Sequence, residues 1–217
     1  MGSIVIKKLN KFTTLPVLID LLHRKKITLI DPKLWEDKND TKGIFEYKKS
    51  KHIKNLFALC FSYSDETVHL WKAFSNGPYG CCIEFNYDLL LKEIKKAHPL
   101  FKHGPVEYKK LKDIEYPQKR IHEDKIPFIK RWPYRCEEEY RIMVEIIGKK
   151  SLFHEVRIPL EVINKITISQ HMSQQVFNSI KKYLEKIIGT HEIKINRSTL
   201  YENKRWIKGL KVIVTKK

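Results

Sequence analysis

Short apolar runs of strand length alternate with segments of helical periodicity along the whole chain, and this alternation constrains the fold more than any other feature. "LFALCFS" and "CCIEF" are typical of buried strands, whereas "TTLPVLIDLLHRKK" and "SQQVFNSIKKYLEKII" place apolar residues at helical spacing. The order lacks a strict strand–helix–strand repeat, and no internal repeat or low-complexity linker divides it. Glycine-rich phosphate loops are also absent. We therefore expect residues 1–217 to form a single α+β domain.

The remaining segments follow the same two periodicities. We expect two more helices, "YDLLLKEIKKAH" and "ETVHLWKAFS", the second capped by Asp65. "KLWEDKNDTKG" is expected to be a polar loop with Asn39 and Asp40 as turn formers. Further strands are expected at "IVIKKL", "ITLIDP", "PVEYKK", "SLFHEVRI", "KITIS", "HEIKI" and, closing the chain, "LKVIVT".

Length, hydrophobic content and cysteine spacing narrow the class of protein. With 217 residues, 42% of them hydrophobic, the chain can bury a sizeable core. No apolar run approaches the roughly 20 residues of a membrane span, and the first residues lack the apolar region of a signal peptide, so we expect a cytoplasmic protein without a membrane partner. Cys60, Cys81, Cys82 and Cys136 have no C-x-x-C spacing and are expected to be reduced core thiols, with no metal site.

Basic residues outnumber acidic residues by 43 to 25, which gives a net charge of +18 and a pI near 9.6. The basic residues are spread along the chain, and a field of this sign attracts polyanions. RNA or DNA is therefore the expected partner, although no base-reading motif accompanies the charge. The other interpretation is that the lysines only make a solvated surface.

Against this background, "RCEEEYRIMVEI" places three acids in a row before an alternating apolar run. In an extended chain Glu137, Glu139 and Arg141 lie on one face, while Tyr140 and the apolar residues that alternate after it lie on the other. The acids are then either ion-paired residues of a solvated strand or a carboxylate pair that holds a sugar and stabilises positive charge at its anomeric carbon.

Four stretches carry a resemblance that spans nearly the whole chain: "ITLIDPKLWEDKND", "CFSYSDETVHLWKAFSNGPYGCCIEF", "KRWPYRCEEEYRI" and "PLEVINKITIS". Together they resemble a large bacterial family that shares an N-D element, a C-F-S strand, a Trp-bearing helix, a G-x-C-I-E-F strand and an E-x-E-x-R element preceded by tryptophan. In its architecture this family is similar to a remote relative of the ADP-ribosyltransferases, which bind NAD with a split α+β sheet. The resemblance implies a split, mostly antiparallel sheet with flanking helices.

The same resemblance implies roles for particular residues. Glu139 would hold the ribose that carries nicotinamide, and Glu137 would orient the acceptor. The NAD-binding residues would be Lys7 or Lys8 on the first strand and Ser62, with Ser64 as a second possibility, on a middle strand. Arg141 and Trp71 are further candidates for the NAD site, although an amphipathic helix more often buries its tryptophan in the core. Asn39, Asp40 and Lys130 match the family without a role that we can derive.

The function implied is transfer of ADP-ribose from NAD to RNA, DNA or protein, in a toxin or phage-defence effector held in check by an antitoxin or another inhibitor protein. Two other functions remain open. "GIFEYKK" and "GPVEYKK" each contain an E-x-K on a possible strand, which with an upstream aspartate is the minimum for a Mg²⁺-dependent nuclease. The third is a non-catalytic module that binds nucleic acid or protein.

Overall fold

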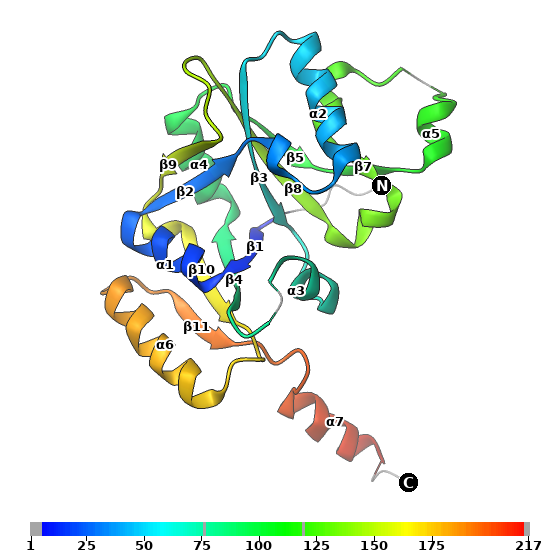
Figure 1. The fold of residues 1–217 in the computed structure, drawn as a ribbon. Helices are drawn as coiled ribbons and strands as arrows, with labels where there is room; N and C mark the ends of the chain where they lie inside the picture. Colours follow the sequence, from blue (N-terminus) through cyan, green and yellow to red (C-terminus); the bar gives the residue numbers. More distant parts are fainter. Residues whose placement is uncertain (1–5, 76, 119, 215–217) are drawn as a thin grey trace.

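A nine-stranded, mostly antiparallel sheet with helices packed against it forms the body of the protein (Figure 1). The computed structural model describes residues 6–75, 77–118 and 120–214. The sheet contains β1 (Lys8–Thr14), β2 (Lys26–Ile30), β3 (Asn55–Ser62), β4 (Gly80–Asn86), β5 (Lys102–Pro105), β8 (Glu139–Ile146), β9 (Phe153–Arg157), β10 (Ile163–Ile168) and β11 (Lys194–Arg197). β6 (Glu107–Lys109) and β7 (Ile129–Arg131) form a separate parallel pair. The expected single α+β domain is therefore what the described residues form.

The described residues also form seven α-helices and four short 3₁₀ segments. The helices are α1 (Leu15–Arg24), α2 (Lys38–Ser50), α3 (Val68–Phe74), α4 (Tyr87–Ala97), α5 (Leu111–Glu115), α6 (Gln174–Ile188) and α7 (Lys204–Val214). The 3₁₀ segments are η1 (Pro32–Leu34), η2 (Glu123–Phe128), η3 (Trp132–Glu137) and η4 (Leu160–Val162).

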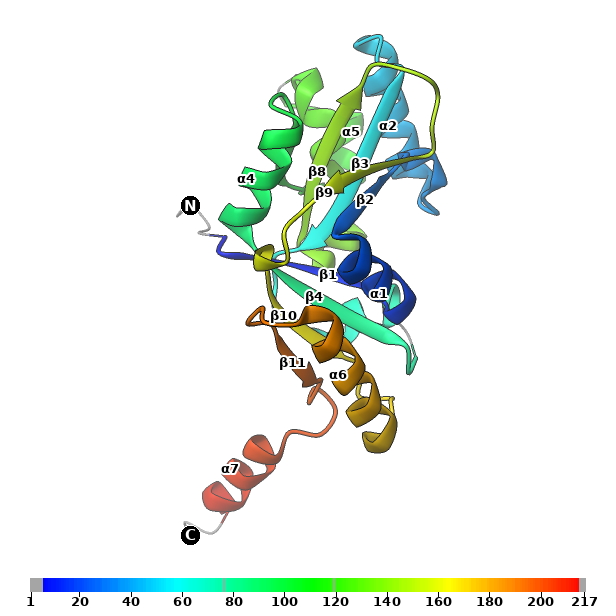
Figure 2. The same ribbon diagram turned by 90° about the vertical axis from the view of Figure 1, so that its left-hand side faces the viewer.

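The sheet forks between β1 and β3. β1 pairs with β4 along its whole length but meets β3 at one position, where Asn10 lies opposite Ser62. β3, in contrast, pairs with β8 from end to end. One half therefore runs β11–β10–β4–β1, and the other contains β3, β8 and β5 with β2 and β9. Figure 2 shows the two halves diverging from this point, which confirms the expected split sheet.

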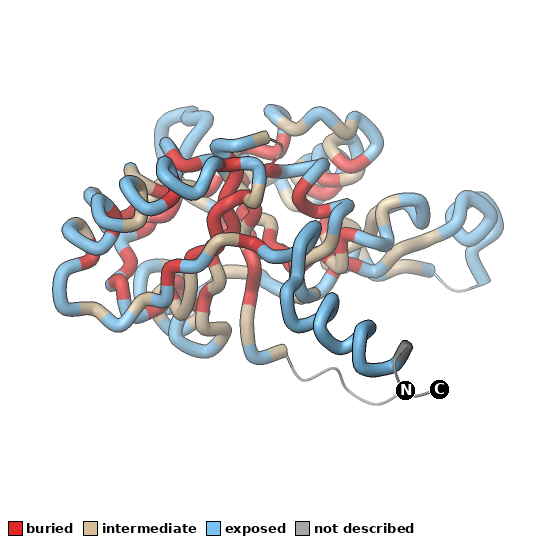
Figure 3. Tube along the Cα trace, turned by 90° about the horizontal axis from the view of Figure 1, so that it is seen from below, coloured by how far each residue is buried: buried red, intermediate tan, exposed pale blue. Residues whose placement is uncertain are grey.

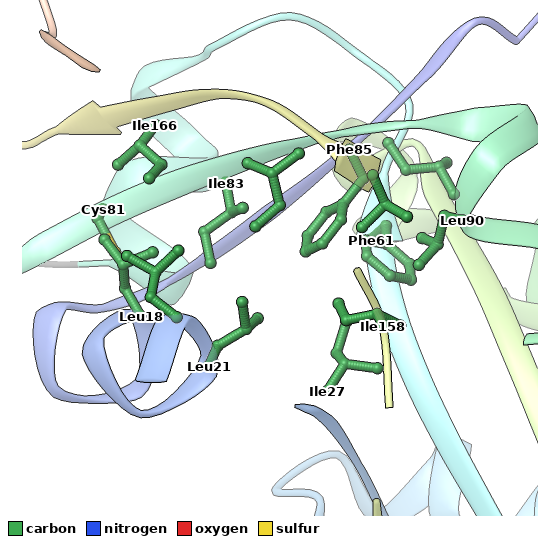
Figure 4. Close-up of a cluster of buried hydrophobic side chains, with 14 of the residues drawn as sticks. Leu18, Leu21, Ile27, Phe61, Cys81, Ile83, Phe85, Leu90, Ile158 and Ile166 are labelled. Carbon is green, nitrogen blue, oxygen red and sulfur yellow. The ribbon is translucent and has the colours of Figure 1, made fainter. Parts of the chain in front are cut away.

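The main core lies between one face of the sheet and helices α1, α4 and α6. Leu18 of α1, Phe85 of β4 and Ile166 of β10 meet there with almost no exposure (Figure 4). Helix α1 begins after Thr14 and has Pro16 in its first turn, where a missing N–H costs nothing. Its apolar residues recur at helical spacing, so one stripe of the helix is buried, as the sequence predicts.

Two expectations about the "KLWEDKNDTKG" and "GIFEYKK" segments were wrong. Both lie mostly in helix α2 and not in a loop and a strand. The Asp37 carboxylate accepts hydrogen bonds from the backbone N–H groups of Asn39 and Asp40, which makes Asp37 the N-cap. Short polar side chains form turns and helix caps by the same hydrogen bond, and here the apolar residues Ile44 and Tyr47 favour the helix.

Four smaller differences concern ends and exposure. Residues 210–214 of the last segment, "LKVIVT", lie in helix α7 and not in a strand. Helix α3 is capped by Thr67, whose hydroxyl accepts from the N–H of Leu70, and not by Asp65. Cys136 is exposed, unlike the buried Cys81 and Cys82. The first strand begins at Lys8, and Ile4 and Val5 of the expected strand lie outside the described residues. Within the described part of the chain, no helix is sufficiently long and apolar to span a bilayer.

Candidate active site

A cleft of about 740 Å³ opens at the fork of the sheet. Its floor is a row of side chains across three neighbouring strands, because Asn10 of β1 lies opposite Ser62 of β3, and Ser62 lies opposite Glu139 of β8. Helices α2 and α3 and segment η3 supply the walls. The lining residues are Asn10, Lys11, Phe12, Leu34, Trp35, Glu36, Asp37, Asp40, Cys60, Phe61, Ser62, His69, Leu70, Ala73, Phe74, Lys130, Tyr134, Glu137 and Glu139.

Beneath the cleft, the fully buried Arg141 joins two carboxylates. Its Nε donates to Glu139 Oε1 at 2.6 Å, and its terminal nitrogens donate to Glu139 Oε2 at 3.1 Å and to Asp40 Oδ1 at 2.9 Å. The guanidinium also donates to the carbonyl of Pro127 and lies 5.0 Å from the ring centre of Trp35. A planar fork held from several sides has little freedom to rotate, so Arg141 fixes the position of Glu139.

Lys130 connects the two acids of the E-x-E element. Its ammonium group donates to Glu137 Oε2 at 2.6 Å and to Glu139 Oε2 at 3.1 Å. Glu137 belongs to η3 and not to the strand, and Glu138 between the acids has a left-handed backbone with a φ of 42°. This turn brings both carboxylates to the same ammonium. The expected extended face was therefore correct for Glu139 and wrong for Glu137.

The acids are not part of a solvated strand. Glu137 and Glu139 are 6% and 4% exposed, and both faces of β8 are buried. Tyr140 and Ile142 point into the main core, whereas Met143, on the face of Glu139, packs with Ile44 of α2. Buried charges need partners, because leaving one unpaired costs several kcal/mol, on the order of 3–5. The interpretation as surface ion pairs is wrong, and the charged row is the floor of a cleft.

The two acids differ in their expected ionisation. Burial would raise the pKa of Glu139, but Arg141 and Lys130 stabilise its charge and lower the pKa to about 2. For Glu137, burial is the larger effect and the negative Glu139 adds to it, so its pKa is raised although Lys130 opposes the change. Burial lowers the pKa of Lys11, which also lines the cleft. One carboxylate is thus held ionised beside another that accepts a proton more readily.

The structure separates the other candidates from the sequence. Ser62 lines the cleft, and its hydroxyl lies 3.0 Å from that of Ser64. Lys7 is exposed and Lys8 lines a neighbouring cavity, where it pairs with Asp65 at 2.5 Å. Trp71 is buried against Phe12, with its indole N–H on Glu66, and it does not line the cleft. Arg141 lies behind Glu139 and does not line the cleft either.

Several residues that line the cleft were not assigned to a site from the sequence. Asp40 and Lys130 were noted only for matching a family, and Lys11 and Asp37 were not singled out. His69 of helix α3 also lines the cleft and was not singled out as a site residue. Asp37 Oδ1 caps α2, whereas its Oδ2 is buried with no hydrogen-bond partner among the described residues. The sequence feature that could have identified Asp37 is its N-cap position directly before α2.

Neither E-x-K element lines the cleft. Glu46 and Lys48 lie on helix α2, where side chains two residues apart point in different directions. Lys109 is instead ion-paired with Glu107, its own neighbour in the element. Outside Met1–Val5, Asn76, Lys119 and the last three residues, no group of three or more His, Cys, Asp or Glu side chains is arranged to hold a metal ion.

Among solved structures, the chain is similar to DarT from Thermus sp. 2.9. The DarT complex with NAD⁺ has 9% sequence identity and a TM-score of 0.46, covering 91% of this chain and 98% of DarT. The DarT complex with ADP-ribosylated single-stranded DNA has 10% identity and the same TM-score, covering 89% and 94%. No family model matches the sequence, and no curated protein does. The assignment of function therefore rests on the cleft itself.

Proposed function

We propose that this protein is an ADP-ribosyltransferase that takes NAD as its substrate and binds it in the cleft at the fork. The observation that carries the proposal is an acidic cleft in a basic protein. Five carboxylates line it against two lysines, although the whole chain has a net charge of +18. Such a site favours a positively charged group, and NAD presents one in its nicotinamide ring and in the ribose as nicotinamide leaves.

The other contents of the cleft support a ligand of this size and kind. A volume of about 740 Å³ lies within the usual range for cofactor-sized ligands, which is roughly 300–1,000 Å³. Trp35 and Tyr134 provide aromatic surface, and the unpartnered Asp37 Oδ2 provides an acceptor for a hydroxyl or an amide. We assign to Lys11 the NAD-binding role on the first strand that the sequence resemblance gave to Lys7 or Lys8, because Lys11 lines the cleft.

Each acid has a distinct role in the proposed reaction. Glu139, held ionised by Arg141 and Lys130, faces the ribose and stabilises positive charge at the anomeric carbon as its bond to the nicotinamide nitrogen breaks. Nicotinamide leaves with the bonding electron pair, and an acceptor oxygen or nitrogen forms the new bond. Glu137 takes the proton that the acceptor loses, since Lys130 binds its Oε2 and burial makes this carboxylate accept a proton more readily than Glu139 does.

The acceptor and the biological setting are parts of the same proposal. The net charge of +18 supports RNA or DNA as the acceptor, with a protein side chain as the alternative. We propose a cytoplasmic toxin or phage-defence effector, restrained by an antitoxin or another inhibitor protein.

Purified protein incubated with NAD labelled in the adenylate part, together with single-stranded DNA, RNA and mixed protein, tests this function. We expect released nicotinamide and label on one acceptor. Glu139→Gln should lower the rate by about 10²–10³, because it removes a preorganised charge. Glu137→Gln should lower transfer to the acceptor more than hydrolysis of NAD, since water can react without an oriented base.

Two controls make this result decisive. Glu192→Gln changes an exposed carboxylate outside the cleft and should stay within a few-fold of the parent rate. Circular dichroism confirms that each variant is folded. Intact NAD combined with Mg²⁺-dependent, EDTA-sensitive cutting of nucleic acid would replace the transferase with the nuclease. Nucleic-acid binding that is unchanged in Glu139→Gln, without any turnover of NAD, would favour the non-catalytic module.

A further inference from the structure

Helix α7 projects from the body of the protein and leaves its apolar side uncovered. Figures 1 and 2 show it beyond β11, and the tube in Figure 3 is exposed along this helix. The side chain of Asn203 caps its first turn by accepting from the N–H groups of Arg205 and Trp206. Trp206, Leu210 and Ile213 follow at intervals of four and three residues, so they lie on one side of the helix. They are 68%, 46% and 71% exposed.

The charge of this helix restricts what can cover it. Residues 204–214 contain four basic residues and no acidic residue. A surface that buries the apolar side also meets the basic residues around it. It therefore binds better if it carries negative charge at its edge. The net charge of +18 on a second copy of this chain opposes its approach to the basic helix. The complementary surface is apolar in its centre and acidic at its edge.

Beside α7 lies a second cavity, of about 990 Å³, which we call the notch. Arg205, Trp206 and Ile207 line one side, and the outer face of β1, β4 and β10 lines the other. This sheet face carries Lys165 and Lys8, both ion-paired with Glu84. Among the described residues, Thr167 Oγ1 on the same face has no hydrogen-bond partner, and the residue is only 2% exposed. A buried hydroxyl without a partner is costly unless a ligand group completes it.

We propose that α7 and the notch together form the docking site for an acidic protein. The partner encloses the Trp206–Leu210–Ile213 line in an apolar groove, in the way that amphipathic helices are commonly bound, and its acidic rim meets the basic residues. It also inserts a polar side chain into the notch, where that side chain hydrogen-bonds to Thr167. This inference does not depend on the reaction proposed for the other cleft.

Other occupants match the surface less well. A nucleic acid would neutralise the basic side but leave the apolar line exposed to water. An anionic bilayer would cover both, as it does for interfacial helices, but a flat lipid surface does not enter a notch between a helix and a sheet. A folded protein can bury the apolar line, pair with the basic residues beside it and hydrogen-bond to the buried hydroxyl at once.

Site-specific photo-crosslinking in the native host identifies the partner. A photoreactive residue placed at Ile207 in the full chain reports what occupies the notch, and mass spectrometry identifies the crosslinked protein. The purified partner is then titrated against the full chain. We expect an acidic protein whose affinity falls at least about 100-fold with Leu210→Asp and about tenfold with Thr167→Val. Leu100→Asp is the matched control, since Leu100 is 92% exposed elsewhere, and it should bind like the parent.

Parallel binding assays use phosphatidylglycerol–phosphatidylcholine vesicles and a short single-stranded oligonucleotide. The proposal is overturned if Leu210→Asp abolishes vesicle or oligonucleotide binding while no protein is crosslinked. It is equally overturned if position 207 crosslinks only to another copy of this chain, or if the purified partner binds Leu210→Asp as tightly as the parent. Circular dichroism of each variant excludes misfolding as the cause of lost binding.

Discussion

Arg141 is the residue on which the charge balance of the cleft depends. It lies in contact with two carboxylates from segments about 100 residues apart in sequence, since Asp40 comes from α2 and Glu139 from β8. Three acids, Asp40, Glu137 and Glu139, share two cations, Arg141 and Lys130. Removing either cation would leave buried negative charge without a partner. Breaking a buried ion pair by removing one partner is strongly destabilising.

Arg141→Met should therefore lower the free energy of unfolding by about 3–5 kcal/mol, because two carboxylates lose their partner inside the protein. Chemical denaturation followed by circular dichroism measures the loss. Arg131→Ala removes an exposed arginine of the neighbouring β7 strand and should stay within about 0.5 kcal/mol of the parent. An Arg141→Met protein as stable as the parent would mean that Glu139 is not ionised in the folded state.

The lowered pKa of Glu139 also predicts a pH dependence. The folded-state pKa is about 2 and the ordinary value is 4.5, so the stability that this group contributes is complete above pH 4.5 and is lost as pH falls towards 2. The contribution is on the order of 3 kcal/mol. In Glu139→Gln, the fall of the melting temperature between pH 4.5 and 2 should be shallower than in the parent. Parallel curves for the two proteins would contradict the assignment.

At the scale of the elements, Gly80 and Gly43 differ in what an added side chain would meet. A Cβ at Gly80, the first residue of β4, would lie 1.9 Å from the backbone oxygen of Ser75. A Cβ at Gly43, inside α2, would meet nothing within 4 Å. Gly80→Ala should destabilise the protein by about 1–3 kcal/mol, whereas Gly43→Ala should stabilise it by about 0.5–1 kcal/mol. Thermal melts of both variants measure the difference, and equal effects would be inconsistent with this geometry.

The periodicity of the sequence predicted the helices and strands that pack against the core. It did not predict elements whose conformation is decided by something other than core packing. Helices α1, α4 and α6 and strands β3, β4 and β10 carry clear apolar stripes or runs, and all were expected. "LKVIVT" has strand-like composition, but its described residues, 210–214, belong to a longer amphipathic helix and do not pair with a sheet edge. Helix α2 was expected to be a loop because Asn39 and Asp40 were interpreted as turn formers, and short polar side chains of this kind occur both in turns and at helix starts.

At the scale of the whole molecule, the net charge of +18 predicts steep salt dependence. Binding of a single-stranded oligonucleotide should weaken by roughly 10²–10⁴ between 50 and 200 mM salt if six to ten phosphates are contacted, because condensed counterions are released. Fluorescence anisotropy at several salt concentrations gives the slope. An affinity that is absent at low salt would show that the basic residues only solvate the surface.

The E-x-E acids of the cleft were predictable because they stand together in one segment, whereas the groups that tune them were not. Lys130 lies on β7 and Asp40 on α2, and only the folded chain brings them to Glu139. Periodicity describes which face a residue occupies but not which distant segment covers that face. The sequence therefore indicated a carboxylate pair and left its ionisation undetermined.

A single residue pair joins β1 to β3, so the fork can act as a pivot between the two halves of the sheet. Each half of the sheet is stiffened by its own long ladders, β1 with β4 and β3 with β8, but one register position links them. A change in the angle between the halves is therefore resisted mainly by side-chain packing across the fork, where Phe61 meets Phe85 edge to face at 5.6 Å. Because the row from Asn10 to Glu139 crosses this pivot, twisting one half against the other changes the spacing of the floor residues before it disturbs either ladder.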